Sequence, residues 1–400
     1  MVTGDGAYIK KINRGLILQN IIEHGMISRA DISKITGLNK ATVSVQVADL
    51  LNEELIYEIE QEHHAVGRRP IMLSINEKAG YVLGIDLDFE HIKFMVSDLY
   101  GNTVTSNTLI LETSEYEEIV EILIHHINKY REAHAESHYG LISVLIGIHG
   151  TVNNDETIYF VPKFRWQNKD LKTDLAKQLD VDIYIENNAN LSAYAERVYK
   201  YHRSDNLLTI LLSSGIGAGI MIDGKLHKGY HGYAGEMGHM IIAPEGRPCK
   251  CGNHGCWERY AAEPSLFEDL SKILDKPSIT YDDVRKLINE QDPNTYEIIK
   301  DFVSYLTIGL NNIINLYNPE TIVLNSKILR MYPDVIEEIK SNLKSSVSQY
   351  RKIVLSELGN NADVMGASAL AIQRFLEVPE LILHFTEAAV YEENIMKTAK

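Results

Sequence analysis

The chain has 400 residues, of which 45% are hydrophobic, and this length is too great for one core and predicts two or three domains. No apolar run approaches the roughly 20 residues of a membrane span, and no signal pattern opens the chain, so we expect a cytoplasmic protein with no membrane partner. The net charge of −16 is uneven, because residues 1–77 hold 8 Lys and Arg against 10 Asp and Glu while the rest holds 31 against 45. An acidic body repels nucleic acid, so any DNA-binding part is expected within the first 77 residues.

This first segment predicts three helices and a pair of strands. Ser28 is suited to cap the second helix and Asn39 the third, with a short glycine turn between them. Two helices joined by such a turn are typical of a helix-turn-helix. Two alternating strands, "LIYEIE" and "IMLSIN", follow and enclose a polar tip. We therefore predict a winged helix-turn-helix DNA-binding domain over residues 1–77.

In such modules the second helix of the pair enters the major groove with its first residues on base edges. The polar candidates on that helix are Lys40, Thr42, Ser44 and Gln46. Arg68 and Arg69 at the wing tip suit a narrow minor groove, although a solvated hairpin tip is an alternative interpretation. Half-site recognition normally needs two copies, so a homodimer on double-stranded operator DNA is expected.

From Tyr81 onward, short apolar strands alternate with helical segments. The clearest strands are "YVLGIDLD", "IKFMVSDL", "GLISVLIGIHG", "VDIYIENNAN", "NLLTILL" and "TIVLN". This alternation predicts an α/β architecture in two lobes, which we assign to residues 78–378. The tail, residues 379–400, shows no pattern and is left unassigned.

All three cysteines lie in one short stretch, "HMIIAPEGRPCKCGNHGCWE", which runs from His239 to Glu258. The candidate metal ligands are His239, Cys249, Cys251 and Cys256. Three thiolates and one imidazole form a ligand set typical of structural zinc, and four protein ligands leave no coordination position open for chemistry. The alternative is a group of buried or free thiols. We predict one structural Zn²⁺ per chain, which fixes this loop.

The same stretch carries a resemblance to a known family. "GEMGHM" and "CKCGNHGCWE" resemble the zinc signature of the ROK family, which groups sugar-responsive repressors and sugar kinases. "IENNAN" resembles the family's sugar loop, and "NPETIVLN" and "ADVMGASALA" resemble its later strand and closing helix, so the resemblance covers nearly the whole chain. It implies an actin-like, sugar-kinase-like pair of lobes. "TGLNKATVS", "GRRPIML" and "KAGYVLGID" resemble the family's xylose-responsive repressors in particular.

The resemblance also implies a monosaccharide site. The residues that match family sugar contacts are Asn187, Asn188, Glu236, His239 and Glu258. Amides and carboxylates suit a ring of hydroxyls that both donate and accept hydrogen bonds. If one ring nitrogen of His239 holds zinc, the other is free to meet a hydroxyl. The loop "GIHGTV" is a further candidate wall, where His149 replaces the family's usual proline.

Comparison with the family's kinases argues against an enzyme. The phosphate-binding turn is replaced by residues 86–90, "DLDFE", and the glycine patch for the nucleotide by residues 325–327, "NSK". Acidic side chains in the first of these repel a polyphosphate. The catalytic aspartate is replaced by Asn188, whose amide has no usable basicity. Only the glycine turn at 215–219 is kept.

We therefore predict a repressor of xylose-utilisation genes that is released from DNA by D-xylose. The alternatives are a repressor that responds to glucose or an N-acetylhexosamine, and a sugar kinase with a DNA-binding appendage.

Overall fold

The computed structural model describes residues 6–60, 71–384 and 394–396, and the chain divides into two compact units. Unit 1 holds the chain up to Leu191, then Val198–Lys200, and then the chain from Val364 onward. Unit 2 holds Ser192–Arg197 and Tyr201–Asp363. The predicted two-lobed α/β fold is confirmed. The predicted domain boundaries after residues 77 and 378 stay a prediction.

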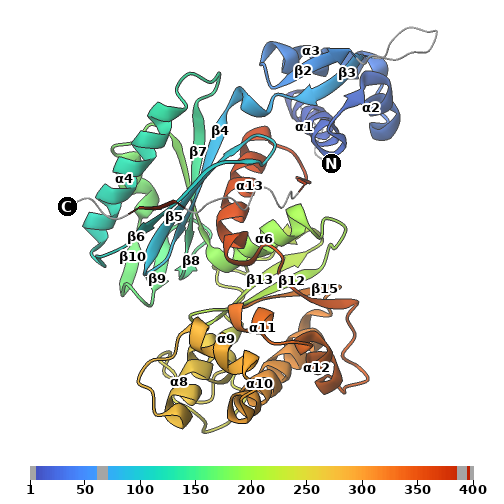
Figure 1. The fold of residues 1–400 in the computed structure, drawn as a ribbon. Helices are drawn as coiled ribbons and strands as arrows, with labels where there is room; N and C mark the ends of the chain where they lie inside the picture. The colour runs from blue at the N-terminus through green and yellow to red at the C-terminus, as the bar shows by residue number, and fades with distance from the viewer. Residues whose placement is uncertain (1–5, 61–70, 385–393, 397–400) are drawn as a thin grey trace. The chain divides into compact units, whose positions relative to one another are not determined.

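The N-terminal part of unit 1 is a helix-turn-helix with a small antiparallel sheet (Figure 1). Its elements are α1 (Gly6–His24), β1 (Ile27–Ser28), α2 (Arg29–Thr36), α3 (Lys40–Asn52), β2 (Ile56–Glu60) and β3 (Ile71–Ile75). Both predicted helix caps are present, because the backbone N–H of Asp31 donates to Ser28 Oγ at 3.1 Å and that of Thr42 to Asn39 Oδ1 at 2.8 Å. The tip between β2 and β3, residues 61–70, lies outside the described residues.

A six-stranded sheet forms the centre of unit 1, in the order β11-β7-β4-β5-β6-β17. Its strands are β4 (Tyr81–Leu87), β5 (His91–Asp98), β6 (Thr103–Ile110), β7 (Leu141–Ile148), β11 (Asp182–Asn187) and β17 (Asn394–Met396). The neighbours β4, β7 and β11 run parallel, so their carboxyl ends meet at one edge of the sheet. A smaller sheet, β10-β9-β8, comprises β8 (Thr151–Val152), β9 (Ile158–Val161) and β10 (Trp166–Lys169). The predicted tail thus contributes one short strand, β17.

Helices cover both faces of the six-stranded sheet. Figure 1 shows α4 (Tyr116–Ala133) on one face and α13 (Ala362–Leu376) on the other. The remaining helices of this part of the chain are α5 (Leu171–Ala176) and α6 (Asn188–Tyr199). The buried side chains of α4, including Ile119, Leu123 and Ile127, recur at helical spacing and give it one apolar face.

Helix α13 makes close backbone contacts within unit 1. A Cβ added at Gly366 would lie 1.9 Å from the carbonyl oxygen of Leu191 on α6, so the two helix backbones touch there. Beyond the end of α13, the carbonyl oxygen of Glu377 lies 2.6 Å from the position that a Cβ of Gly15 on α1 would take. The Lys11 ammonium also pairs with the Glu377 carboxylate at 2.6 Å. Helix α13 therefore contacts α6, and the segment just past its end contacts α1.

Unit 2 is a five-stranded sheet in the order β14-β13-β12-β15-β16, with helices packed against it (Figure 1). Its strands are β12 (Leu207–Leu212), β13 (Ile216–Ile222), β14 (Lys225–Leu226), β15 (Thr321–Asn325) and β16 (Lys352–Leu355). Its helices are α7 (Glu258–Ala261), α8 (Glu263–Leu274), α9 (Tyr281–Asn289), α10 (Pro293–Tyr317), α11 (Lys327–Met331) and α12 (Val335–Asn342). The buried face of α10 includes Phe302, Leu306 and Leu310, which lie in the core of this unit.

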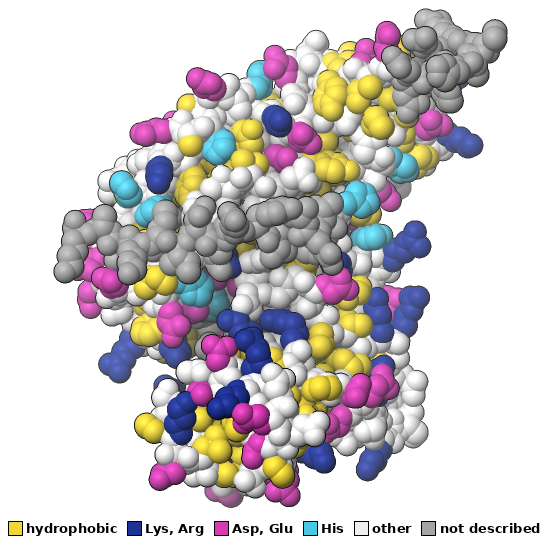
Figure 2. Space-filling model, viewed as in Figure 1, with side chains coloured by type: hydrophobic (Ala, Val, Ile, Leu, Met, Phe, Trp, Pro, Cys, Tyr) yellow, Lys and Arg dark blue, Asp and Glu magenta, His cyan; other side chains and the backbone are white. Residues whose placement is uncertain are grey.

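Two surface properties bear on binding partners. Within the described parts of the chain, no helix combines the length and the apolar character that crossing a bilayer demands. On the face shown in Figure 2, acidic and basic side chains are interspersed.

Candidate functional site

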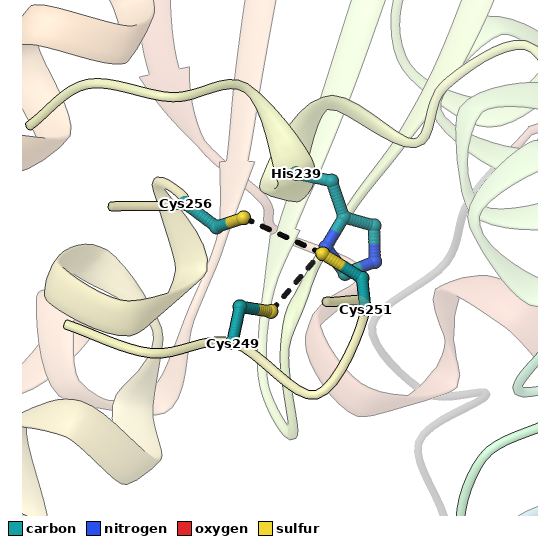
Figure 3. A group of neighbouring side chains, drawn as sticks. All are labelled: His239, Cys249, Cys251 and Cys256. Carbon is teal, nitrogen blue, oxygen red and sulfur yellow. Dashed lines mark hydrogen bonds between the residues drawn. The ribbon is translucent and has the colours of Figure 1, made fainter. Parts of the chain in front are cut away.

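The three cysteines and His239 lie together in unit 2, as the sequence predicts (Figure 3). Their ligand atoms all lie within 4.8 Å of one another. Cys251 Sγ is 3.6 Å from Cys256 Sγ, and Cys249 Sγ is 3.7 Å from His239 Nδ1. A tetrahedral zinc with Zn–S bonds of about 2.3 Å places its ligands about 3.8 Å apart. The side chains therefore have the composition and spacing that zinc requires.

The local backbone explains why these ligands converge. Isolated bridges pair Ile241 with Cys256 and Pro248 with His254, so the loop folds back on itself twice. Gly255 has a φ of 79°, and a Cβ there would lie 1.7 Å from the carbonyl oxygen of Ala243. No other residue fits this turn without moving the backbone.

The buried Trp257 anchors the cysteine loop to the core of unit 2. Its side chain is fully buried, and its Nε1 donates to the carbonyl oxygen of Tyr305 at 3.0 Å. Its ring packs directly on Gly309 of α10, because a Cβ at Gly309 would lie 2.0 Å from the indole. The loop is therefore held in place by Trp257, which directly follows Cys256, as well as by the four candidate ligands.

The pKa values of the three thiols shift in different directions. Burial raises the pKa of Cys251, but hydrogen bonds with the Asn253 backbone and the two neighbouring thiols outweigh it and lower that pKa. Burial raises the pKa of Cys249, and the nearby Glu258 carboxylate raises it further. Burial also raises the pKa of Cys256, with an added contribution from Cys251. Metal ions bind thiolates, so loading of this site releases protons to the solvent.

The imidazole of His239 lies between two carboxylates of unit 2. His239 Nδ1 is 3.6 Å from Glu258 Oε1, and His239 Nε2 is 3.9 Å from Glu236 Oε2. Because Nδ1 also faces Cys249, it is the nitrogen that would bind the metal, which leaves Nε2 for another partner. Glu236, His239 and Glu258 thus form one polar group beside the cysteines, as predicted.

The other predicted sugar contacts, Asn187 and Asn188, belong to unit 1 and lie at the junction of β11 and α6. Asn187 Oδ1 accepts the backbone N–H groups of Ala189 and Asn190 at 2.8 and 3.1 Å, and its Nδ2 donates to the carbonyl oxygen of Gly150 at 2.8 Å. Asn187 therefore caps α6 and holds the neighbouring loop, a structural role that sequence reasoning missed.

Asn188 and His149 contact each other in unit 1. The Asn188 amide nitrogen lies 3.3 Å from His149 Nδ1, and His149 Nε2 lies 2.7 Å from Asp86 Oδ1. Burial raises the pKa of Asp86, but the histidine partners His149 and His91, together with Lys93, outweigh it and hold that pKa below its ordinary value. Asp86 is thus a buried carboxylate with a lowered pKa near the end of β4.

The predicted replacement for the nucleotide patch, residues 325–327, is filled by side chains of unit 2. Asn325 donates to the carbonyl oxygen of Gly359 at 2.7 Å and accepts from Arg330 at 3.0 Å. Ser326 donates to the buried carboxylate of Glu263 at 2.7 Å. The side chains of Asn325 and Ser326 are thus engaged in bonds within unit 2.

The predicted DNA contacts on α3 differ in how far their side chains are exposed. Lys40 and Ser44 are exposed and Thr42 is half-buried, as a contact to DNA requires. Gln46 is only 4% exposed, so its prediction as a base contact is wrong for this conformation of the helix. Val45, which is 57% exposed, lies on the outer face instead. Arg68 and Arg69 lie outside the described residues.

Comparison with known proteins gives a consistent result. Residues 82–374 match the ROK family. The chain belongs to the ROK family. It is 38% identical over 383 residues to the xylose repressor of Bacillus subtilis (strain 168), and the match covers 94% of this chain and 99% of that protein.

Other family members include both regulators and enzymes. A solved ROK family transcriptional regulator, described as a homologue of the E. coli MLC protein, superposes with a TM-score of 0.81 at 25% identity, over 92% of this chain and 96% of that one. The glucokinase of Streptomyces coelicolor (strain ATCC BAA-471 / A3(2) / M145) is 27% identical over 317 residues, which cover 73% of this chain and 98% of the enzyme. The ROK regulator matches the N-terminal helix-turn-helix as well, whereas the glucokinase match covers a smaller share of this chain.

Proposed function

We propose that this ROK protein is a sugar-responsive transcriptional repressor of xylose-utilisation genes, which leaves its operator when D-xylose binds. The observation that carries the proposal is the 38% identity to a xylose repressor over 94% of the chain, which includes the helix-turn-helix. We propose further that it acts in the cytoplasm as a homodimer, because two half-sites need two recognition helices.

The proposed sugar contacts are Glu236, His239, Glu258 and Asn188. Each offers a carboxylate, imidazole or amide, and such groups pair with hydroxyls that both donate and accept. Asn187 contributes by capping the helix that carries Asn188. The proposed DNA-binding domain is residues 1–77, with Lys40, Thr42 and Ser44 at the major groove and Arg68 and Arg69 on the wing.

We expect saturating D-xylose to lower the affinity for operator DNA by about 5- to 150-fold, the effect of a coupling of roughly 1–3 kcal/mol. Fluorescence anisotropy with promoter DNA of the xylose-utilisation genes measures this directly. Glu236→Ala is the control, since it should keep DNA binding and lose the response to sugar. Release by glucose or an N-acetylhexosamine but not by D-xylose would identify that sugar as the effector. No release by any of them would contradict the proposal.

We propose that one structural Zn²⁺ per chain is held by the three cysteines and His239. Metal analysis should therefore find about one zinc per chain, and Cys256→Ser should lower that content sharply. Because metal binding contributes folding free energy, the same variant and a strong chelator should both lower the melting temperature. Lys250→Ala, an exposed neighbour in the same loop, is the matched control and should keep its zinc. Protein without zinc and with three freely titratable thiols would contradict this assignment.

We propose that the chain transfers no phosphate. Asn188→Asp would restore a carboxylate at the position of the catalytic base, yet it should not create a kinase. The Asp86 and His149 pair, and the bonds of Asn325 and Ser326, still occupy the regions that phosphate and nucleotide would need. Sugar-dependent ATP turnover, measured for the wild type and the variant across pentoses and hexoses, is expected to be absent. Turnover in either protein would support the sugar-kinase alternative.

A further inference from the structure

Three polar groups follow the carboxyl ends of three adjacent parallel strands in unit 1. Asp86 lies near the end of β4, His149 directly follows β7, and Asn188 directly follows β11. The strand register pairs Asp86 with Gly147, and Gly147 with Glu186, so the three strand ends lie level. Residues more than 100 positions apart in sequence thereby form one hydrogen-bonded row, Asp86–His149–Asn188.

The Nε2–H tautomer of the His149 ring satisfies its contacts with both Asp86 and Asn188. A proton on Nε2 donates to Asp86 Oδ1 at 2.7 Å, and the unprotonated Nδ1 accepts from the Asn188 amide nitrogen at 3.3 Å. The Asp88 carboxylate lies 3.8 Å from Nδ1, which is too far for a hydrogen bond. Asp86 is 4% exposed, and its Oδ1 lies 2.7 Å from His149 Nε2, so this carboxylate holds the Nε2–H of the tautomer.

This arrangement determines which way the Asn188 amide points. A primary amide presents similar shapes with its oxygen and nitrogen exchanged, and its orientation is set by the hydrogen-bond partners around it. Because His149 Nδ1 takes a proton from the amide nitrogen, the amide oxygen is turned toward the opposite side. An oxygen accepts and does not donate, so the partner it selects must be a hydroxyl that donates its proton.

We propose that His149 is a positioning residue for sugar recognition: held by Asp86, it orients the Asn188 amide so that its oxygen accepts from one sugar hydroxyl. The inference rests on the proposed function, since it takes Asn188 as a sugar contact.

The test is a set of D-xylose titrations by calorimetry. His149→Leu should weaken binding by about 10-fold or more, the effect of an amide left without its partner. His149→Gln should recover most of that loss, because one carboxamide offers a donor for Asp86 and an acceptor for Asn188. His125→Leu is the matched control, since this histidine is exposed on α4 and its loss should leave the affinity within about 2-fold.

A double-mutant cycle separates orientation from general support of the loop. If His149 acts through Asn188, then His149→Leu should cost nothing further in an Asn188→Ala background. An equal loss in both backgrounds, or an unchanged affinity of His149→Leu, would overturn the inference. Melting temperatures of all variants confirm that they are folded. Failure of the wild type to bind any sugar would instead refute the proposed function, so the two failures are distinguishable.

Discussion

Replacing Gly366 with alanine is expected to destabilise unit 1 by about 3 kcal/mol, at the upper end of the usual cost of overpacking. The new Cβ would lie 1.9 Å from the carbonyl oxygen of Leu191 and 2.6 Å from its carbon, so α6 and α13 must separate. The higher helix propensity of alanine offsets only about 1 kcal/mol of this cost. Since α6 begins at Asn188, which we propose as a sugar contact, the same displacement of the helix should weaken sugar binding. Denaturant unfolding and calorimetry measure the two effects.

Gly6→Ala is the control for this change, because no atom lies within 4 Å of the position of its new Cβ. It should leave both stability and sugar affinity close to those of the wild type. A Gly366→Ala protein with unchanged stability would mean that the close contact between α6 and α13 is not maintained in solution.

Gly15→Ala is expected to remove most of the sugar response while the chain still binds sugar. A Cβ on Gly15 would lie 2.6 Å from the carbonyl oxygen of Glu377 and 3.3 Å from Pro379, so α1 must move away from the segment that follows α13. The exposed Lys11–Glu377 ion pair is too weak to hold the module in place by itself. Without this contact, a movement of the proposed sugar loop at Asn187 and Asn188 should no longer shift the DNA-binding helices.

The measurement is the ratio of operator affinities with and without D-xylose, which should fall from about 5–150-fold to about 2-fold or less. Gly6→Ala, in the same helix, should keep the full ratio. A normal ratio in Gly15→Ala would show that the response does not pass through the contact between α1 and the end of α13.

The sequence predicted those features that depend on neighbours along the chain. The caps at Ser28 and Asn39 follow from side chains that reach a backbone N–H three residues away. The metal cluster follows from cysteine spacing, with His239 only ten residues before the first cysteine. Such signals survive in a single sequence because the partners are local.

Two of the missed features were missed for different reasons. The burial of Gln46 could have been found, because it lies three residues after Val43 and four before Leu50 and so shares their buried face. A polar residue on that face was wrongly assigned to the surface. The row of Asp86, His149 and Asn188 could not have been found in this way, because it depends on which strands are neighbours, and strand order is not encoded in periodicity.

The late position of α13 in the chain has a consequence for biosynthesis. The sheet that it covers is complete, except for the short β17, by Asn187, yet α13 begins only at Ala362, after nearly all of unit 2. Translation proceeds at about 5–20 residues per second, so on the order of ten seconds pass between the synthesis of β11 and that of α13. During that interval the apolar face is open to chaperones, and α1 lacks its contact with Glu377. A nascent chain therefore gains the contact between α1 and Glu377 only after unit 2 has been synthesised.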